Sequence, residues 1–136
     1  MVSKAINFSG KHILIIDDKS PFVYSIAGAL KNEGCSVSVT DEENLREKIV
    51  RGDIIDLILV DEQMPKAELE GLVFATRQTA VPTPVVVMSS WEDVEYVGDL
   101  LEKGTVEFID KQAVPSILLR QILMILHQYD IKHVRE

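Results

Sequence analysis

Polar residues that can handle phosphate or metal follow four short apolar runs of this chain. Asp17 and Asp18 follow the first run, Asp61 the second, Ser89 the third, and Lys111 comes after the fourth. Carboxylates held close together repel one another unless a cation compensates them, and the hard cation Mg²⁺ takes oxygen ligands. A metal, a lysine and a hydroxyl around a carboxylate are the parts needed for phosphoryl transfer, with Asp61 as a nucleophile that forms an aspartyl phosphate.

The elements that must position these residues are the strands of a parallel sheet. The runs 13–16, 57–60, 85–88 and 106–109 are rich in Val, Ile and Leu, which is typical of strands buried on both faces. In such sheets, ligands bind outside the carboxyl ends of the strands. We therefore predict that the acids, the hydroxyl and the lysine meet at one edge of the sheet.

Cap and turn signals divide the chain into five strand–helix units. Ser20-Pro21 predicts a helix start and Gly34 the end of that helix. The remaining predicted elements are an edge strand over 35–39 and helices over 40–51, 71–78, 92–103 and 115–128. The fold predicted is α/β and flavodoxin-like, a (βα)5 three-layer sandwich with a five-stranded parallel sheet of order 2-1-3-4-5. The domain would span 11–128, between tails at 1–10 and 129–136.

Composition excludes several other classes of protein. The 136 residues suit one domain, and the net charge of -8 argues against direct binding to nucleic acid. The single Cys35 rules out an internal disulfide, and no run has signal-peptide character or membrane-spanning length. The expected setting is therefore cytoplasmic, without membrane contact.

Each candidate residue also has an ordinary structural explanation. An Asp at a strand end is commonly a turn or helix-cap residue, a Ser is commonly a cap, and a Lys there is usually solvated. Compatible groups at all four strand ends are much less expected by chance. This agreement favours the phosphoryl-handling site.

In combination these residues resemble the receiver domain of two-component response regulators, in the CheY-like superfamily. The resemblance covers about 11–128 and rests on Asp17-Asp18, on Asp61 with Met64-Pro65, on Ser89 and on Lys111. It implies that Asp61 is the phosphoacceptor of a phosphorelay and is served by a sensor histidine kinase or a histidine phosphotransfer protein. The chain would be a signalling switch that catalyses only its own phosphorylation and dephosphorylation, and not an enzyme with a separate substrate.

The resemblance implies a role for each further site residue. Asp17, Asp18 and Asp61 would hold Mg²⁺ or Mn²⁺ together with the backbone carbonyl of Gln63. Lys111 would pair with the phosphoryl group, the Ser89 hydroxyl would move to a phosphoryl oxygen, and Phe108 would turn inward with it. Phe108 replaces the commoner Tyr, so its movement would depend on packing alone.

The chain departs from the family pattern after its lysine. Gln112 follows Lys111, where the family usually has a proline after a cis peptide bond. A cis bond before a residue other than proline costs about 3–4 kcal/mol. We therefore expect either a trans Lys111-Gln112 bond with a displaced lysine or a rare cis bond.

A further departure lies near the mouth of the predicted site, where Ser90 occupies a position that usually holds Ala or Gly in the family, and Trp91 follows it. Gln63 and Trp91 occupy positions where the family tunes access of water and phosphodonor to the acceptor. Trp91 would either shield the phosphoryl group, which gives slow dephosphorylation, or simply pack on the surface. The loop from Pro65 to Gly71 is about two residues longer than usual in the family, which surface loops tolerate.

The last predicted helix is too apolar to have only one buried face. We expect some of Leu119, Leu123 and Met124 on its outer face, beside the fourth helix and fifth strand. Exposed apolar patches mark interaction sites, so we predict a homodimer through the 92–126 face, or a following domain that covers it. Phe22 and Tyr24 lie where histidine-containing partners commonly dock in the family, and one of the two is expected in the core.

Three other functions compete with the phosphorylation switch. A pseudo-receiver would keep the fold for protein interaction without being phosphorylated. A small aspartyl-phosphate phosphatase would need a general acid at position 63, which is Gln. A Rossmann-type nucleotide binder is disfavoured, because no Gly-rich loop follows the first strand. No output domain is predicted within the sequence, which fits a stand-alone receiver or a fragment.

Overall fold

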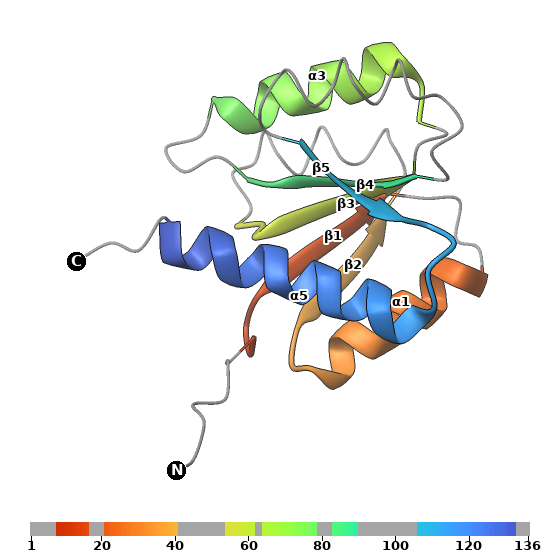
Figure 1. Cartoon of the computed structure of the whole chain (residues 1–136). Coiled ribbons are helices and arrows are strands. Elements are labelled where there is room, and N and C mark those ends of the chain that lie inside the picture. The colour runs from red at the N-terminus through yellow and green to blue at the C-terminus, as the bar shows by residue number, and fades with distance from the viewer. Residues whose placement is uncertain are drawn as a thin grey trace.

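The computed structural model describes residues 8–16, 21–40, 54–61, 64–78, 83–89 and 106–132 (Figure 1). The predicted helix over 92–103 lies outside these residues, and so does the one over 40–51 apart from Thr40, which ends a strand. Ser20, the predicted cap of the first helix, and the part of the predicted 92–126 dimer face before residue 106 are also outside them.

Five parallel strands form one sheet in the order β2-β1-β3-β4-β5, as the sequence predicts. The strands are β1 (His12–Ile16), β2 (Ser36–Thr40), β3 (Leu57–Asp61), β4 (Val85–Ser89) and β5 (Val106–Asp110). The helices in the described part are α1 (Pro21–Asn32), α3 (Lys66–Arg77) and α5 (Pro115–Lys132). None of these helices is both long and apolar enough to cross a bilayer.

Helices cover both faces of the sheet, with α1 and α5 on one side and α3 on the other (Figure 1). Side chains alternate across a strand, so Leu57 and Leu59 join the core under α1 and α5, while Ile58 and Val60 join the core under α3. Every residue of β3 and β4 is buried, whereas the edge strand β2 is partly exposed. The uninterrupted apolar runs of the central strands follow from this burial on both faces.

Helix α3 begins earlier than predicted, at Lys66 in place of Gly71. The chain enters the helix directly from Pro65, and the good helix formers of 66–70 continue it. Leu69 is fully buried and anchors this first part of the helix. The segment from Pro65 to Gly71 is therefore mostly helix, and the prediction of a lengthened loop was wrong.

The packed part of the chain extends past the predicted limits at both ends. Helix α5 continues to Lys132, beyond the predicted end at Gln128, with Leu126 buried and Tyr129 half-buried. Phe8, predicted to lie in the N-terminal tail, is buried in the core under α1 and α5. Neither extension has a periodic signal in the sequence long enough to predict it.

Two glycines give opposite predictions for substitution by alanine. Gly34 ends α1 in a Schellman arrangement, in which its own N–H bonds the Lys31 carbonyl and the Cys35 N–H bonds the Leu30 carbonyl. Its φ is +95°, and an added Cβ would lie 3.2 Å from Ser9 Cα. Gly71 lies inside α3, where an added Cβ meets nothing within 4 Å.

We therefore expect Gly34→Ala to destabilise the fold by about 1–2 kcal/mol, since alanine is strained at positive φ. Gly71→Ala should raise the free energy of unfolding by roughly 0.5–1 kcal/mol, because glycine is a poor helix former. Urea denaturation of the two variants measures both changes. Equal effects of the same sign would contradict this account of the two backbone positions.

Candidate functional site

Strand register brings the predicted site residues to one edge of the sheet. Asp61 is the last residue of β3 and pairs with Met88 of β4, and Ser89 pairs with Asp110 of β5. On the other side, Ile16 at the end of β1 lies opposite Val60. The carboxyl ends of four neighbouring strands are thus nearly level.

Asp61 is held firmly at this edge. It is only 8% exposed, which is unusual for an aspartate and indicates that its charge needs a partner. Its backbone carbonyl accepts a hydrogen bond from the N–H of Met64 at 3.1 Å, and Met64 is itself buried in the core under α3. This hydrogen bond and the burial of Met64 hold the end of β3 in place.

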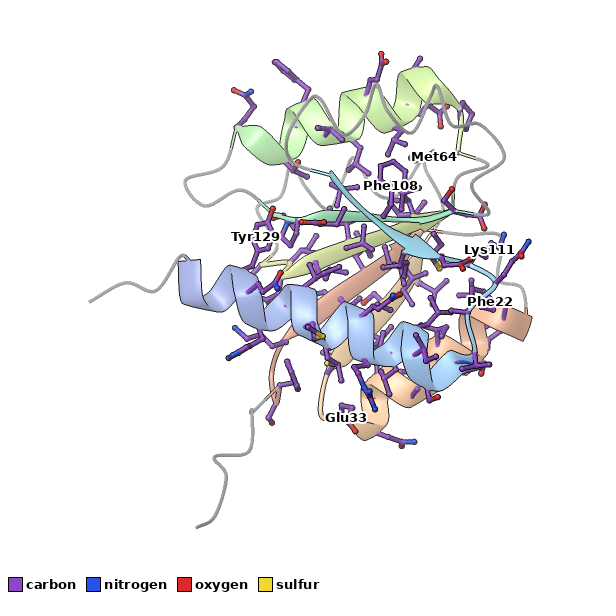
Figure 2. All side chains as sticks on the ribbon, in the orientation of Figure 1. Phe22, Glu33, Met64, Phe108, Lys111 and Tyr129 are labelled. Carbon is purple, nitrogen blue, oxygen red and sulfur yellow. The ribbon has the colours of Figure 1, made fainter. Side chains whose placement is uncertain are left out.

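Lys111 supplies the partner of that charge. Its Nζ forms an ion pair with Asp61 Oδ2, although β4 lies between β3, which carries the aspartate, and β5, which leads into the lysine. The Lys111 N–H also donates to the carbonyl of Ser89 at 2.8 Å, which fastens its backbone to the end of β4. Figure 2 shows Lys111 beyond the end of β5.

The predicted displacement of this lysine is therefore wrong. The described residues contain no cis peptide bond, so the Lys111–Gln112 bond is trans, as one of the two expectations had it. The lysine nevertheless reaches Asp61, because its backbone is already fastened beside β4 and its side chain is long enough to span the remaining gap. A proline is not needed for this contact.

Ser89 and Phe108 occupy different surroundings near the site. Ser89 is completely buried at the end of β4. Phe108 is half-buried and packs against the core on the α3 side, as Figure 2 shows. The ring thus points inward here, and the movement predicted for it stays a prediction.

Four predicted site residues lie outside the described residues: Asp17, Asp18, Gln63 and Trp91. Within the described part, no group of three or more His, Cys, Asp or Glu side chains is placed to hold a metal. The chemistry of the donor set still fits a hard cation, since Asp61 is a carboxylate at the edge and two more aspartates follow Ile16 in sequence.

Two groups with displaced pKa values in the described part lie away from this edge. Burial, and then Glu33 and Asp56, raise the pKa of the Cys35 thiol just before β2. Burial, and then Glu107, raise the pKa of Tyr129 near the end of α5. Both groups stay protonated at neutral pH, so neither supplies a base to the site.

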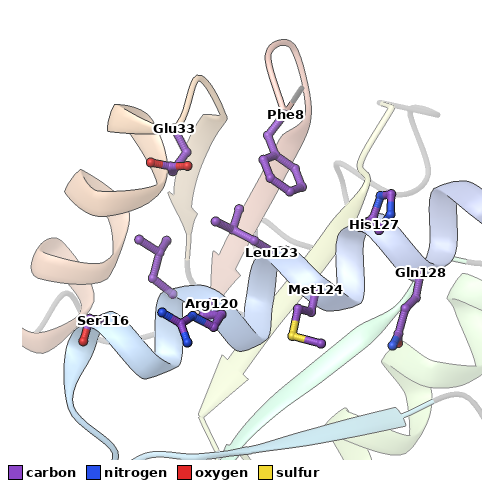
Figure 3. A pocket seen from close by; sticks show the side chains of 9 residues that line it. Phe8, Glu33, Ser116, Arg120, Leu123, Met124, His127 and Gln128 are labelled. Atoms are coloured by element: carbon purple, nitrogen blue, oxygen red, sulfur yellow. The ribbon is translucent and has the colours of Figure 1, made fainter. Parts of the chain in front are cut away.

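The apolar outer side of α5 differs from its prediction. Leu119 and Leu123 are half-buried and line a shallow apolar groove with Phe8, whereas we expected them beside β5 (Figure 3). Met124 is 55% exposed and lines the same groove. The buried stripe of the helix consists of Leu118, Ile122 and Leu126. The two leucines lie beside this stripe, on the side that faces Phe8 and Glu33.

The two aromatic residues of α1 divide as predicted. Phe22 packs against the core under α1 and α5, and Tyr24 is 56% exposed. Tyr24 therefore remains the aromatic side chain of α1 that a partner could touch.

Sequence reasoning missed one residue beside the site. Asp110 Oδ1 accepts a hydrogen bond from the N–H of Gln112 at 2.8 Å, and the Asp110 carbonyl accepts one from the N–H of Ala113 at 3.1 Å. An aspartate that accepts from the N–H two residues on is the signature of an Asx-turn. The signal that could have found it is an aspartate at the very end of a predicted strand.

Comparison with known proteins finds a matching family and similar proteins. The family described as "response regulator receiver domain" matches residues 13–123. A probable transcriptional regulator, ycf27 of Cyanidium caldarium, is 28% identical over 124 residues, which cover 91% of this chain and 49% of that protein. The phosphate regulon transcriptional regulatory protein PhoB of Pseudomonas aeruginosa is 26% identical over 123 residues, covering 88% of this chain and 53% of that protein. The chain thus spans about half the length of these two relatives.

Solved structures show the same fold. A response regulator receiver domain protein (CheY-like) from Methanospirillum hungatei superimposes with a TM-score of 0.74 at 24% identity, covering 91% of this chain and 99% of that one. A response regulator from Thermotoga maritima gives a TM-score of 0.72 at 23% identity, covering 87% and 98%. At these identities the likeness concerns the fold alone.

Proposed function

The chain belongs to the response regulator receiver domain family, and from this premise we propose that it is a phosphorylation switch whose acceptor is Asp61. The phosphoryl donor would be a phosphohistidine on a sensor histidine kinase or on a histidine phosphotransfer protein. The observation that carries the proposal is the ion pair between Lys111 and the buried Asp61, formed across an intervening strand.

The chemistry of this pair suits a phosphoryl acceptor. A carboxylate oxygen of Asp61 attacks phosphorus, a P–O bond forms, the P–N bond to the donor histidine breaks, and the histidine nitrogen leaves with the bond's electron pair. The Lys111 ammonium is a compact positive charge that can move from the carboxylate to the phosphoryl oxygens as the charge shifts onto them. The same lysine can therefore pair with the Asp61 carboxylate before phosphorylation and with the phosphoryl oxygens after it.

Ser89 supports the switching part of the proposal. Its hydroxyl is a hydrogen-bond donor at the end of β4, and the residue is buried beside the backbone of Lys111. A phosphoryl group on Asp61 would give this hydroxyl a new acceptor, and Phe108 on the next strand would repack when Ser89 moves. Partner binding would then depend on the positions of these two side chains.

A divalent cation fits the site as a cofactor. Asp17, Asp18, Asp61 and the backbone carbonyl of Gln63 would hold Mg²⁺ or Mn²⁺, which neutralises phosphoryl oxygens when bound. Asp61 would serve both as a metal ligand and as the phosphoacceptor, so the loss of this residue would remove both roles.

Phosphorylation of the purified chain tests the proposal. Incubation with acetyl phosphate and Mg²⁺ should add one phosphoryl group, detected by intact mass, and should change the fluorescence of Trp91, the only tryptophan. Asp61→Asn should give neither change, and chelation of the metal should abolish both in the native chain. Glu107→Gln, which neutralises an exposed acid on β5, serves as the charge-matched control and should behave as native.

Two results would contradict the switch. If neither acetyl phosphate nor a phosphorylated kinase modifies the native chain, the pseudo-receiver function replaces it. If Asp61→Asn is phosphorylated like the native chain, the acceptor is a different residue.

A further inference from the structure

The chain presents its lysine without the proline that usually follows it in the family, and the turn after β5 shows how. Three hydrogen bonds surround Lys111. Its own N–H bonds the Ser89 carbonyl at 2.8 Å, the Ala113 N–H bonds the Asp110 carbonyl at 3.1 Å, and the Gln112 N–H bonds Asp110 Oδ1 at 2.8 Å. The last of these bonds uses an N–H that a proline at position 112 would lack.

We propose that Asp110 is a positioning residue, which holds the turn in the form that points Lys111 at Asp61. This inference rests on the proposed function, because the ion pair is useful only if Asp61 accepts a phosphoryl group. The role is one of geometry: the Asp110 carboxylate binds the backbone of the turn and leaves the lysine for Asp61.

Burial cannot hold this turn by itself. Asp110, Gln112, Val114 and Pro115 are all exposed, whereas Ala113 packs partly against the core. A lysine side chain has four rotatable bonds and loses much conformational entropy when it is fixed. If the backbone beneath it also moved, the ion pair would be populated for less of the time.

The bond from Asp110 is suited to prevent that movement. The carboxylate accepts from the residue directly after Lys111, while the Ser89 carbonyl holds the lysine's own N–H. The peptide units on both sides of the Lys111 Cα are therefore fixed. The bond depends on an oxygen acceptor at this position, which a side-chain carboxylate or a side-chain amide can provide.

Two substitutions at Asp110 separate the effect of the hydrogen-bond acceptor from the effect of the negative charge. Asp110→Ala removes the acceptor, whereas Asp110→Asn keeps an Oδ1 acceptor and removes the charge. We expect Asp110→Ala to slow phosphorylation by acetyl phosphate about fivefold, the usual effect of losing one hydrogen bond. Asp110→Asn should stay near the native rate. Glu107→Ala, which deletes another exposed acid of β5, is the matched control and should also stay near it.

A double-mutant cycle tests whether Asp110 acts through Lys111. In the background of Lys111→Met, Asp110→Ala should cause no further loss of rate, because the side chain that it positions is absent. If the rate loss of the double variant equals the product of the losses of the two single variants, the proposal is overturned. A native rate for Asp110→Ala, or an equal loss for Asp110→Asn, would also overturn it.

An NMR measurement keeps this inference distinct from the proposed function. In the native chain, Asp61→Asn should shift the Cε and Hε signals of Lys111, because it removes the negative charge of the ion pair. We expect the same shift in the background of Asp110→Asn and a much smaller one in that of Asp110→Ala. If the native chain is not phosphorylated, this pattern would still establish the positioning role. Equal shifts in both backgrounds would refute it even in a phosphorylated protein.

Discussion

Replacing Lys111 with methionine is expected to slow the phosphorylation of Asp61 by about 10²–10³-fold, the usual loss when one group that stabilises transition-state charge is removed. Methionine keeps an unbranched chain of similar length, so the principal change is the lost ammonium. The reason lies in the ion pair between Lys111 Nζ and Asp61 Oδ2, which places this charge where the phosphoryl group would arrive. The rate is measured by intact mass at a series of times after acetyl phosphate and Mg²⁺ are added.

Stability should change much less than the rate. The Lys111 side chain is 36% exposed, so water screens its ion pair with Asp61 and can take the place of the ammonium beside that carboxylate in Lys111→Met. The loss of stability should therefore be about 1 kcal/mol. The variant should thus unfold at a urea concentration close to that of the native chain, although its phosphorylation is much slower. Lys31→Met, which removes an exposed positive charge near the end of α1, is the matched control and should keep the native rate. A native rate for Lys111→Met would show that Asp61 does not depend on this lysine.

The largest loss of stability is expected from Leu59→Ala, at about 2–5 kcal/mol. Leu59 lies in the middle of β3, is fully buried, and belongs to the core under α1 and α5. The substitution removes buried apolar surface and leaves a cavity between closely packed strands that cannot collapse to fill it. Since native proteins are stable by only about 5–15 kcal/mol, the loss is a large part of the total.

Urea denaturation gives the free energy of unfolding for this variant, from the midpoint at an unchanged slope. Phe74→Ala is the matched control, because Phe74 is 67% exposed on α3 and its truncation should cost less than about 0.5 kcal/mol. A loss below about 1 kcal/mol for Leu59→Ala would mean that the central strand is packed less tightly than its burial indicates.

The central part of the fold could be predicted from local signals. Pro21 and Gly34 mark the limits of α1 because proline suits a first helical position and glycine tolerates the positive φ that ends a helix. The apolar runs that form β3 and β4 have no polar alternation because both faces of those strands are covered. Parallel strands with right-handed connections then leave few possible orders, and the predicted order is the one observed.

Other features had no local signal of sufficient strength. Helix α3 begins at Lys66, and Gly71, the predicted start, lies inside it. The prediction failed because helix propensity alone cannot distinguish a residue in the interior of a helix from one in its first turn. Phe8 was predicted in a tail, yet it is buried by residues far from it in sequence. Leu119 and Leu123 are an apolar excess that the sequence reveals, but the side of α5 on which they lie depends on how that helix packs.

The sequence by itself determined which functional groups lie at this edge: an aspartate and a hydroxyl each end a strand, a lysine follows another, and strands of one parallel sheet end at one edge. The tertiary structure decided whether the lysine reaches the aspartate. That contact depends on hydrogen bonds from Lys111 to Ser89 and from Gln112 to Asp110, the first of which forms only after β4 and β5 have paired. The sequence determines which residue stands at each position. The direction of an exposed turn depends on hydrogen bonds to residues that come close only when the chain has folded.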